Sequence, residues 1–310
     1  MSDGMTGQFI WHELVTTDAK SAAGFYSKVA SLKTKAAEFQ PTYTLLTGSG
    51  RPMGGLITLA DAAKAMGASA PHWLSFVGAA NVDETARRAE SLGGHIVSGP
   101  GPVPDGGRYA VLQDPQGAVF AIYGNRDGQG GATSDIPLGH SSWHELATTD
   151  HVAAFSFYQQ LFGWVMTSEM DMGPQGSYRM FAPTGAKDPF GGMYTKAPGS
   201  PGGPNWLPYI KVADARPATV VAKKNGAQIL NGPMQVPGGG WITMGIDPQG
   251  VAFALHSVAA ATPAKKKAAM AKGKVATKSK RKATKKIAKK KSAPKTKAKK
   301  MVRKRAGSKK

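Results

Sequence analysis

The sequence has 310 residues, no cysteine and a formal net charge of +21. The lack of cysteine excludes disulfides, thiolate nucleophiles and cysteine-ligated metals. Residues 264–310 hold 23 lysines and arginines and no acidic residue, which leaves 17 basic against 19 acidic residues in the rest of the chain. We see neither a signal-peptide pattern nor an apolar run of about 20 residues, so we expect a cytoplasmic protein without a membrane span.

Long stretches of the chain occur twice. Residues 11–18 (WHELVTTD) return as 143–150 (WHELATTD), and residues 114–121 (DPQGAVFA) return as 247–254 (DPQGVAFA). Such self-similarity at a nearly fixed offset indicates a tandem duplication, and each copy is long enough to bury a core of its own. We therefore predict an N-terminal extension at 1–7, a first domain at 8–124, a linker at 125–139, a second domain at 140–257 and a basic tail at 258–310.

The first half of each copy predicts a strand, a helix and further short strands. The opening strands are expected at 8–16 and 140–148, each followed by an aspartate that can cap a helix N-terminus. In the second copy the apolar residues of the helix share one face and Gly163 can end it, whereas the first copy has Ser31 at that point. Short strands are expected around 43–47, 54–59, 178–182 and 191–195.

The second half of each copy repeats this order. In the first copy a strand is expected at 73–79, a helix near 82–92, and strands near 95–98, 108–112 and 118–123. An Asp-Pro-Gln-Gly turn precedes the last strand in both copies, where proline fixes φ and glycine takes the fourth position. Each copy therefore contains two strand–helix–three-strand units.

This order of motifs resembles the vicinal oxygen chelate superfamily, which includes glyoxalase I, bleomycin-resistance proteins and extradiol dioxygenases. The resemblance rests on a strand that ends in Asp, a helix that carries Phe-Tyr and closes near Leu-Phe-Gly, and the Asp-Pro-x-Gly turn; it covers residues 8–257. It implies an α+β fold of tandem domains, in which paired βαβββ units form a cup-shaped mixed sheet with helices outside. A small molecule, and often a divalent metal, would be bound in the cup.

The resemblance also implies positions for metal ligands, on the first strand, on the strand that opens the second unit and on the last strand. These positions are occupied by Trp11, Leu74 and Ala121 in the first copy and by Trp143, Leu207 and Ala254 in the second. A hard cation needs oxygen or imidazole donors, so we expect no metal cofactor.

The histidines leave a metal site open as an alternative. His12 and His144 are one residue from the first-strand ligand position, and His72 is two residues before Leu74. A shift of one residue along a strand turns the side chain to the opposite face. The other interpretation is therefore that His12 and His144 pack under the helices and each make one buried hydrogen bond.

Two glutamates are the candidate catalytic residues. Glu13 and Glu145 share a strand face with Trp11 and Trp143. A carboxylate beside an indole in an apolar cup should have a raised pKa, and could act as a general base or bind a polar ligand group. The alternative is an exposed or ion-paired carboxylate at the mouth of the sheet. The residues expected to line the ligand pockets are Trp11, Glu13, His72, Arg108, Trp143, Glu145 and Trp241.

The tail alternates lysine with alanine, threonine, serine and proline, and is too poor in apolar residues to fold alone. It resembles the C-terminal tails of histone H1 and of some bacterial nucleoid proteins, which implies non-specific phosphate binding. RNA, polyphosphate, an anionic membrane surface or a purely solubilising role are alternatives to DNA. The candidate nucleic-acid-binding residues are Lys265, Lys266, Lys267, Lys280, Arg281, Lys282, Lys289, Lys290, Lys291, Arg303, Lys304 and Arg305.

These observations predict a monomeric or homodimeric protein that binds a small organic molecule in its cups, without the usual metal, and that is nucleoid-associated through DNA or RNA binding by its tail. One alternative is a metal-dependent lyase, hydroxylase-like or dioxygenase-like enzyme. A second alternative is a nucleoid-associated protein in which the folded part serves as a docking or sensing module.

Overall fold

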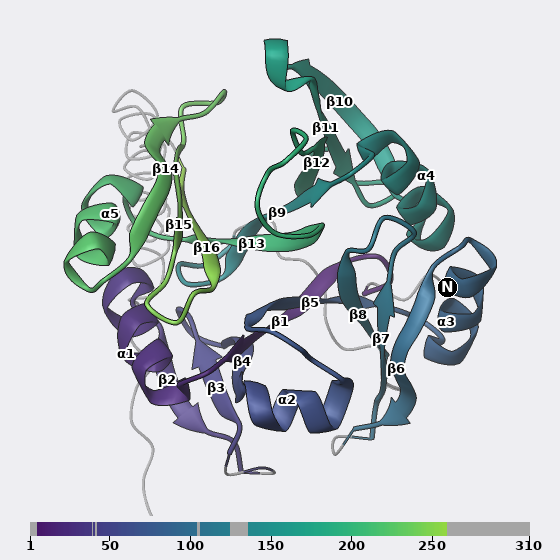
Figure 1. Cartoon of the computed structure of the whole chain (residues 1–310), viewed down its shortest axis with the longest axis horizontal. Helices are drawn as coiled ribbons and strands as arrows, with labels where there is room; N and C mark the ends of the chain where they lie inside the picture. Colours follow the sequence, from purple (N-terminus) through teal and green to yellow (C-terminus); the bar gives the residue numbers. More distant parts are fainter. Residues whose placement is uncertain (1–4, 39, 41, 104–105, 125–135, 259–310) are drawn as a thin grey trace, which may run out of the picture. The chain divides into compact units, whose positions relative to one another are not determined.

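The computed structural model describes residues 5–38, 40, 42–103, 106–124 and 136–258 (Figure 1). The predicted tail beyond Val258, most of the predicted linker and most of the N-terminal extension lie outside these residues. Residues 1–259 form one compact unit, which contains both copies of the repeat.

Each copy of the repeat forms one eight-stranded mixed sheet. The strand order is β2-β3-β4-β1-β5-β8-β7-β6 in the first sheet and β10-β11-β12-β9-β13-β16-β15-β14 in the second. The first sheet comprises β1 (Phe9–Thr16), β2 (Lys33–Ala36), β3 (Thr44–Thr47), β4 (Pro52–Thr58), β5 (His72–Gly78), β6 (His95–Pro102), β7 (Arg108–Gln113) and β8 (Val119–Gly124). The second comprises β9 (Ser141–Thr148), β10 (Val165–Asp171), β11 (Ser177–Ala182), β12 (Gly191–Thr195), β13 (Asn205–Lys211), β14 (Gln228–Gln235), β15 (Trp241–Ile246) and β16 (Ala252–Ser257).

Both sheets are built from two βαβββ units, as the sequence predicts. The units meet where their first strands pair antiparallel, β1 with β5 and β9 with β13, and each of these strands also pairs in parallel with the last strand of its own unit. The helices are α1 (Ala19–Ala30), α2 (Leu59–Met66), α3 (Val82–Ser91), α4 (His151–Phe162) and α5 (Ala215–Lys224), with a 3-10 turn at Gly173–Gln175. In the described residues, no helix is long and apolar enough to cross a bilayer.

The predicted caps of the first helices are confirmed. The Asp18 carboxylate accepts from the backbone N–H of Ser21, and Asp150 accepts from two backbone N–H groups at the start of α4. At the other end, Gly163 has a φ of 73° and Ser31 a φ of 56°. Both helices therefore end in the left-handed region that favours glycine, and in α1 a serine occupies that conformation.

The hydrophobic cores on the helix side of the sheets are shared between the copies. One core packs residues of α1, such as Phe25, against α5 and Phe253 of the second copy. The other packs α3 and Phe120 of the first copy against α4 and Trp164. Accordingly, α1 lies beside α5 (Figure 1), and α3 contacts α4. The apolar faces of α1 and α4 are therefore buried against the other copy, while a third hydrophobic cluster lies within the first copy alone.

One helix of the first copy has no counterpart in the second. Helix α2 connects β4 to β5, whereas the equivalent connection in the second copy, residues 196–204, contains no helix. The sequence analysis did not predict α2, although Thr58 caps its N-terminus by accepting from the Asp61 N–H and Gly67 ends it with a φ of 73°. The presence of α2 distinguishes the cup of the first sheet from the cup of the second.

Candidate functional site

The second sheet carries a polar cluster on the face opposite α4. On β9, Leu146 packs into the core that contains α4, so the alternating residues Trp143 and Glu145 point to the other face. Trp143 Nε1 donates to Tyr178 Oη over 2.8 Å, and Tyr178 Oη donates to Glu145 Oε2 over 3.0 Å. Tyr209 lies opposite Trp143 in the pairing of β9 with β13, which places it on the same face, and its hydroxyl donates to Met244 Sδ at 3.4 Å. We call Trp143, Glu145, Tyr178, Tyr194 and Tyr209 the second-sheet cluster.

Burial sets the protonation states of this cluster. It raises the pKa of Glu145, against the hydrogen bond from Tyr178, which lowers it. It also raises the pKa of Tyr194 to about 12 and the pKa values of Tyr178 and Tyr209 well above their ordinary value. The phenols therefore stay neutral, and Tyr178 acts as a donor to the carboxylate. Glu145 is only 9% exposed, as a buried acid rather than one at the mouth of the sheet.

The first sheet has the same relay from tryptophan through tyrosine to glutamate, but it has no counterpart of the Tyr209 hydroxyl. Trp11 Nε1 donates to Tyr43 Oη over 2.9 Å, and Tyr43 Oη donates to Glu13 Oε1 over 2.8 Å. Burial raises the pKa of Glu13 to about 7, in spite of the Tyr43 hydrogen bond. The position equivalent to Tyr209 is Phe76, which has no hydroxyl. Glu13 Oε2 is buried without a hydrogen-bond partner.

Helix α2 covers the relay of the first sheet. Its residues Ala62 and Met66 are buried in one cluster with Phe76 and Ala121 of the sheet, and Trp11 packs against that cluster. Figure 1 shows α2 lying against this sheet, on the side away from α1 and α3. The second sheet has no such helix, and Trp143, Tyr178 and Tyr194 are partly exposed. Among the described residues, no helix covers the second-sheet cluster as α2 covers the relay of the first sheet.

The strand register identifies the row of residues at the family's metal-ligand positions. Trp143 pairs with Tyr209, which pairs with Ala254; Trp11 pairs with Phe76, which pairs with Ala121. The sequence analysis placed Leu74 and Leu207 in these rows, but both lie two residues away, opposite the glutamates. Neither row offers a carboxylate or an imidazole, so the residues present do not fit the metal of the family. The absence of a metal cofactor stays a prediction.

The first-strand histidines lie on the opposite face and meet between the copies. His144 Nδ1 lies 3.0 Å from the Phe190 carbonyl, to which it donates, and its Nε2 lies 3.4 Å from His12 Nε2. His12 must then donate from Nε2, and its Nδ1 accepts from the Ser75 hydroxyl at 3.0 Å. Burial lowers both pKa values, that of His144 to about 4. This geometry agrees with the packing interpretation of these two histidines.

The remaining predicted pocket residues contact other parts of the chain. The Nδ1 of His72 lies 2.8 Å from the Ala70 carbonyl. Arg108 forms a bidentate ion pair with Asp83 on α3, with both distances 2.7 Å. Trp241 lies under the guanidinium of Arg216 on α5, which is 5.1 Å from the ring centroid. Arg108 and Trp241 thus fasten helices to equivalent strands by different chemistry, and neither contacts the glutamate relays.

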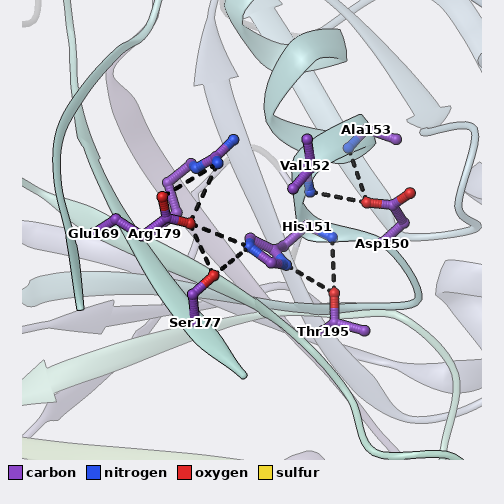
Figure 2. Close-up of polar contacts among 8 residues, drawn as sticks. All are labelled: Asp150, His151, Val152, Ala153, Glu169, Ser177, Arg179 and Thr195. Carbon is purple, nitrogen blue, oxygen red and sulfur yellow. Dashed lines mark hydrogen bonds and ion pairs between the residues drawn. The ribbon is translucent and has the colours of Figure 1, made fainter. Parts of the chain in front are cut away.

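A second polar network, absent from the sequence analysis, lies at the start of α4 (Figure 2). Thr195 Oγ1 accepts from the His151 backbone N–H and lies 2.8 Å from His151 Nδ1. Ser177 donates its single hydroxyl proton to Glu169 at 2.8 Å, so His151 Nε2 carries a proton and donates to Ser177 Oγ at 2.9 Å. Arg179 completes the network through Glu169.

This arrangement of protons indicates that the network holds the strands and α4 together. The histidine donates to Ser177 and therefore does not act as a base toward it. The network joins β10, β11 and β12 to α4 instead. No repeated motif pointed to it, because the first copy has Ala19 where the second has His151. A comparison of the positions at which the copies differ could have found it.

The chain belongs to the Glyoxalase/Bleomycin resistance protein/Dioxygenase superfamily. The model of this family matches residues 8–122 and 139–255, one match for each copy. The fold and the tandem arrangement expected from the sequence are thereby confirmed.

Three other proteins are similar to this chain. A candidate glyoxylase, CFP32 of Mycobacterium tuberculosis, is 33% identical over 119 residues, which span 38% of this chain and less than half (44%) of that relative. The anthracycline biosynthesis protein DauV of a Streptomyces species is 25% identical over 82% of this chain and 94% of its own. The Mn(II)-bound glyoxalase of Novosphingobium aromaticivorans has a TM-score of 0.58 at 17% identity over 82% of both chains, which shows a common fold.

Proposed function

We propose that the second-sheet cluster binds a small, flat organic molecule without the metal that other members of the family use. The observation that carries this proposal is the relay from Trp143 through Tyr178 to Glu145, on a sheet face that no helix of the described chain covers. In the first copy the same relay lies under α2. One binding site per chain is therefore expected.

The chemistry of the cluster suits an aromatic ligand. Indole and phenol faces offer stacking surfaces, and a buried carboxylate fixes the orientation of a polar ligand group. The relative DauV, similar over most of both chains, is named for anthracycline biosynthesis, which supports a polycyclic aromatic ligand. A carboxylate with a raised pKa could also accept a proton from such a ligand, which keeps a metal-independent enzymatic role within the proposal. The metal-dependent lyase, hydroxylase-like or dioxygenase-like alternative would need ligands that the Trp143–Tyr209–Ala254 row does not provide.

The proposal is tested by tryptophan fluorescence titration of the full chain with a dihydroxyanthraquinone. Saturable quenching is expected, because Trp143 belongs to the cluster. Glu145→Gln should weaken binding about tenfold, since it replaces an ionisable hydrogen-bond acceptor, while the matched Glu13→Gln in the covered first sheet should leave it unchanged. Absence of saturable binding, or equal effects of the two substitutions, would contradict the proposal.

We also propose that the tail binds nucleic acid non-specifically and makes the protein nucleoid-associated. The support is compositional: residues 264–310 carry 23 basic side chains and no acidic one. Binding by counterion release should weaken steeply as salt rises and should not depend on base sequence. A chain that ends at Ser257, checked for its fold by circular dichroism, should lose binding to a DNA duplex. If the shortened chain still binds DNA, the folded unit rather than the tail is the part that binds nucleic acid.

A further inference from the structure

We infer that the ligand of the second-sheet cluster carries a cationic amine, which is held by an aromatic cage around Glu145. This inference rests on the proposed function and adds the charge of the ligand. The cage consists of the rings of Trp143, Tyr178, Tyr194 and Tyr209, which come from four different strands. Aromatic faces attract ammonium groups through the ring quadrupole, most strongly where water is excluded.

The rings converge on the carboxylate. Tyr178 and Tyr194 lie with ring centroids 6.2 Å apart and planes 18° from parallel. Tyr178 donates to Glu145, and Trp143 is joined to the carboxylate through Tyr178. Tyr209 directs its hydroxyl toward Met244 Sδ at 3.4 Å, so a polarisable thioether lines the same face. An ammonium group placed here would meet aromatic faces and a carboxylate together.

The charge balance of the cluster favours a cation. In the described part of the chain, the side chain that donates a hydrogen bond to Glu145 is the neutral phenol of Tyr178. A carboxylate in an apolar environment is stabilised by a positive charge within about 4–6 Å, and an anion there would be repelled. The raised pKa of Glu145 agrees with this, because burial without a cationic partner disfavours the charged form.

The first sheet lacks counterparts of two phenols of the cage. Tyr194 pairs with Ala147 one step beyond Glu145, and the residue at the equivalent step in the first sheet is Ile57. Tyr209 is replaced by Phe76, and Met66 of α2 lies in the cluster above the sheet. The first copy thus keeps the glutamate and the indole but has aliphatic and aromatic hydrocarbon in place of two phenols. The full cage occurs only where the sheet is uncovered.

The test compares three probes built on one anthraquinone ring system, with an aminoalkyl, a hydroxyalkyl or a carboxyalkyl side chain. Affinities for the full chain are measured by calorimetry at physiological salt. The aminoalkyl probe should bind about tenfold more tightly than the hydroxyalkyl probe, which corresponds to a cation–π and ion-pair gain of about 1.4 kcal/mol. Only binding that Glu145→Gln weakens is assigned to the cage, which separates it from binding of the carboxyalkyl probe to the basic tail.

Variants separate this inference from the proposed function. Tyr194→Leu and Glu145→Gln should each reduce the preference for the amine, while Glu169→Gln, on the opposite face of the second sheet, should leave it unchanged. Equal or tighter binding of the hydroxyalkyl probe, with sensitivity to Glu145→Gln retained, would overturn the amine inference and leave the proposed function standing. Loss of binding by all three probes would overturn both.

Discussion

The hydroxyl of Tyr26 donates to Asp247 Oδ2 over 3.0 Å, which joins α1 of the first copy to the Asp-Pro-Gln-Gly turn of the second. The reciprocal pair, Tyr158 and Asp114, has the same length of 3.0 Å. In both turns the other aspartate oxygen accepts backbone N–H groups of the turn itself. The tyrosine of the Phe-Tyr motif in each copy is therefore bound to the Asp-Pro-Gln-Gly turn of the other copy.

Removal of one hydroxyl from these pairs should destabilise the whole folded unit. Tyr26→Phe leaves a buried aspartate oxygen without its donor, and we expect the free energy of unfolding to fall by about 2 kcal/mol. Tyr158→Phe should have a similar effect. Because the cores are shared, chemical denaturation should show one transition in each variant, by circular dichroism and by tryptophan fluorescence. A variant in which one copy unfolds before the other would refute the shared-core account.

Substitution of Ser31 should raise the free energy of unfolding rather than lower it. A serine in the left-handed region is strained by roughly 1 kcal/mol relative to glycine, and Gly163 occupies the equivalent position in α4. Ser31→Gly should therefore raise the free energy of unfolding by about 1 kcal/mol. Gly163→Ser is the matched reverse change and should lower it by a similar amount. If both changes destabilise the protein, the left-handed end of α1 is incorrect.

The His12–His144 contact should make the folded unit sensitive to acid. Both histidines are held neutral by burial, with folded pKa values below the unfolded value of 6.5, so the unfolded chain binds more protons in acid. Their stabilising contribution is complete above about pH 6.5 and is lost as the pH falls toward about 4. The nearby His140, which lowers the pKa of His12 further, acts in the same direction.

The measurement is the free energy of unfolding of the wild-type chain and of His144→Gln between pH 4 and pH 8. The difference between the two curves cancels the titration of groups common to both. We expect the wild-type curve to fall more steeply below pH 6.5. Parallel curves would show that the histidine pair does not titrate as the geometry requires.

Glu13 should oppose this trend, because its folded pKa of about 7 lies above the unfolded value of 4.5. The folded state then binds more protons, so the contribution of Glu13 is present below about pH 4.5 and is lost as the pH rises toward 7. The loss for this buried group is about 3 kcal/mol. Glu13→Gln should therefore gain stability relative to the wild type between pH 4 and pH 8 in denaturant unfolding. If the difference in the free energy of unfolding between the variant and the wild type does not change with pH, the Glu13 carboxyl is not buried as described.

Local patterns and the duplication were sufficient to predict the units, the caps and the final strands. Strand alternation also placed Glu145 correctly beside Trp143 on one face. The partners Tyr178 and Tyr209 were missed because they come from strands distant in sequence, and no local pattern determines such pairings. Helix α1 shows the same limit for the fold: its apolar face indicates burial, but not that the burying surface belongs to the other copy.

Two further outcomes depended on contacts between distant elements. Arg108 and Trp241 follow glycine-rich turns in equivalent places, and only the positions of Asp83 and Arg216 reveal that both serve helix packing. Helix α2 was not predicted although its Thr58 and Asp61 form a recognisable cap, because the second copy has no equivalent helix and the repeat therefore does not indicate one. The features that distinguish the two cups lie where the copies differ.

The central claim is that the second-sheet cluster binds its ligand without a metal. Calorimetric titration of the full chain with the dihydroxyanthraquinone, after exhaustive chelation and again with added Mn²⁺, tests this most directly. The account predicts one site per chain with the same affinity in both conditions, and loss of most of that affinity in Tyr178→Leu. Binding that appears only when Mn²⁺ is present, or two equivalent sites per chain, would contradict it.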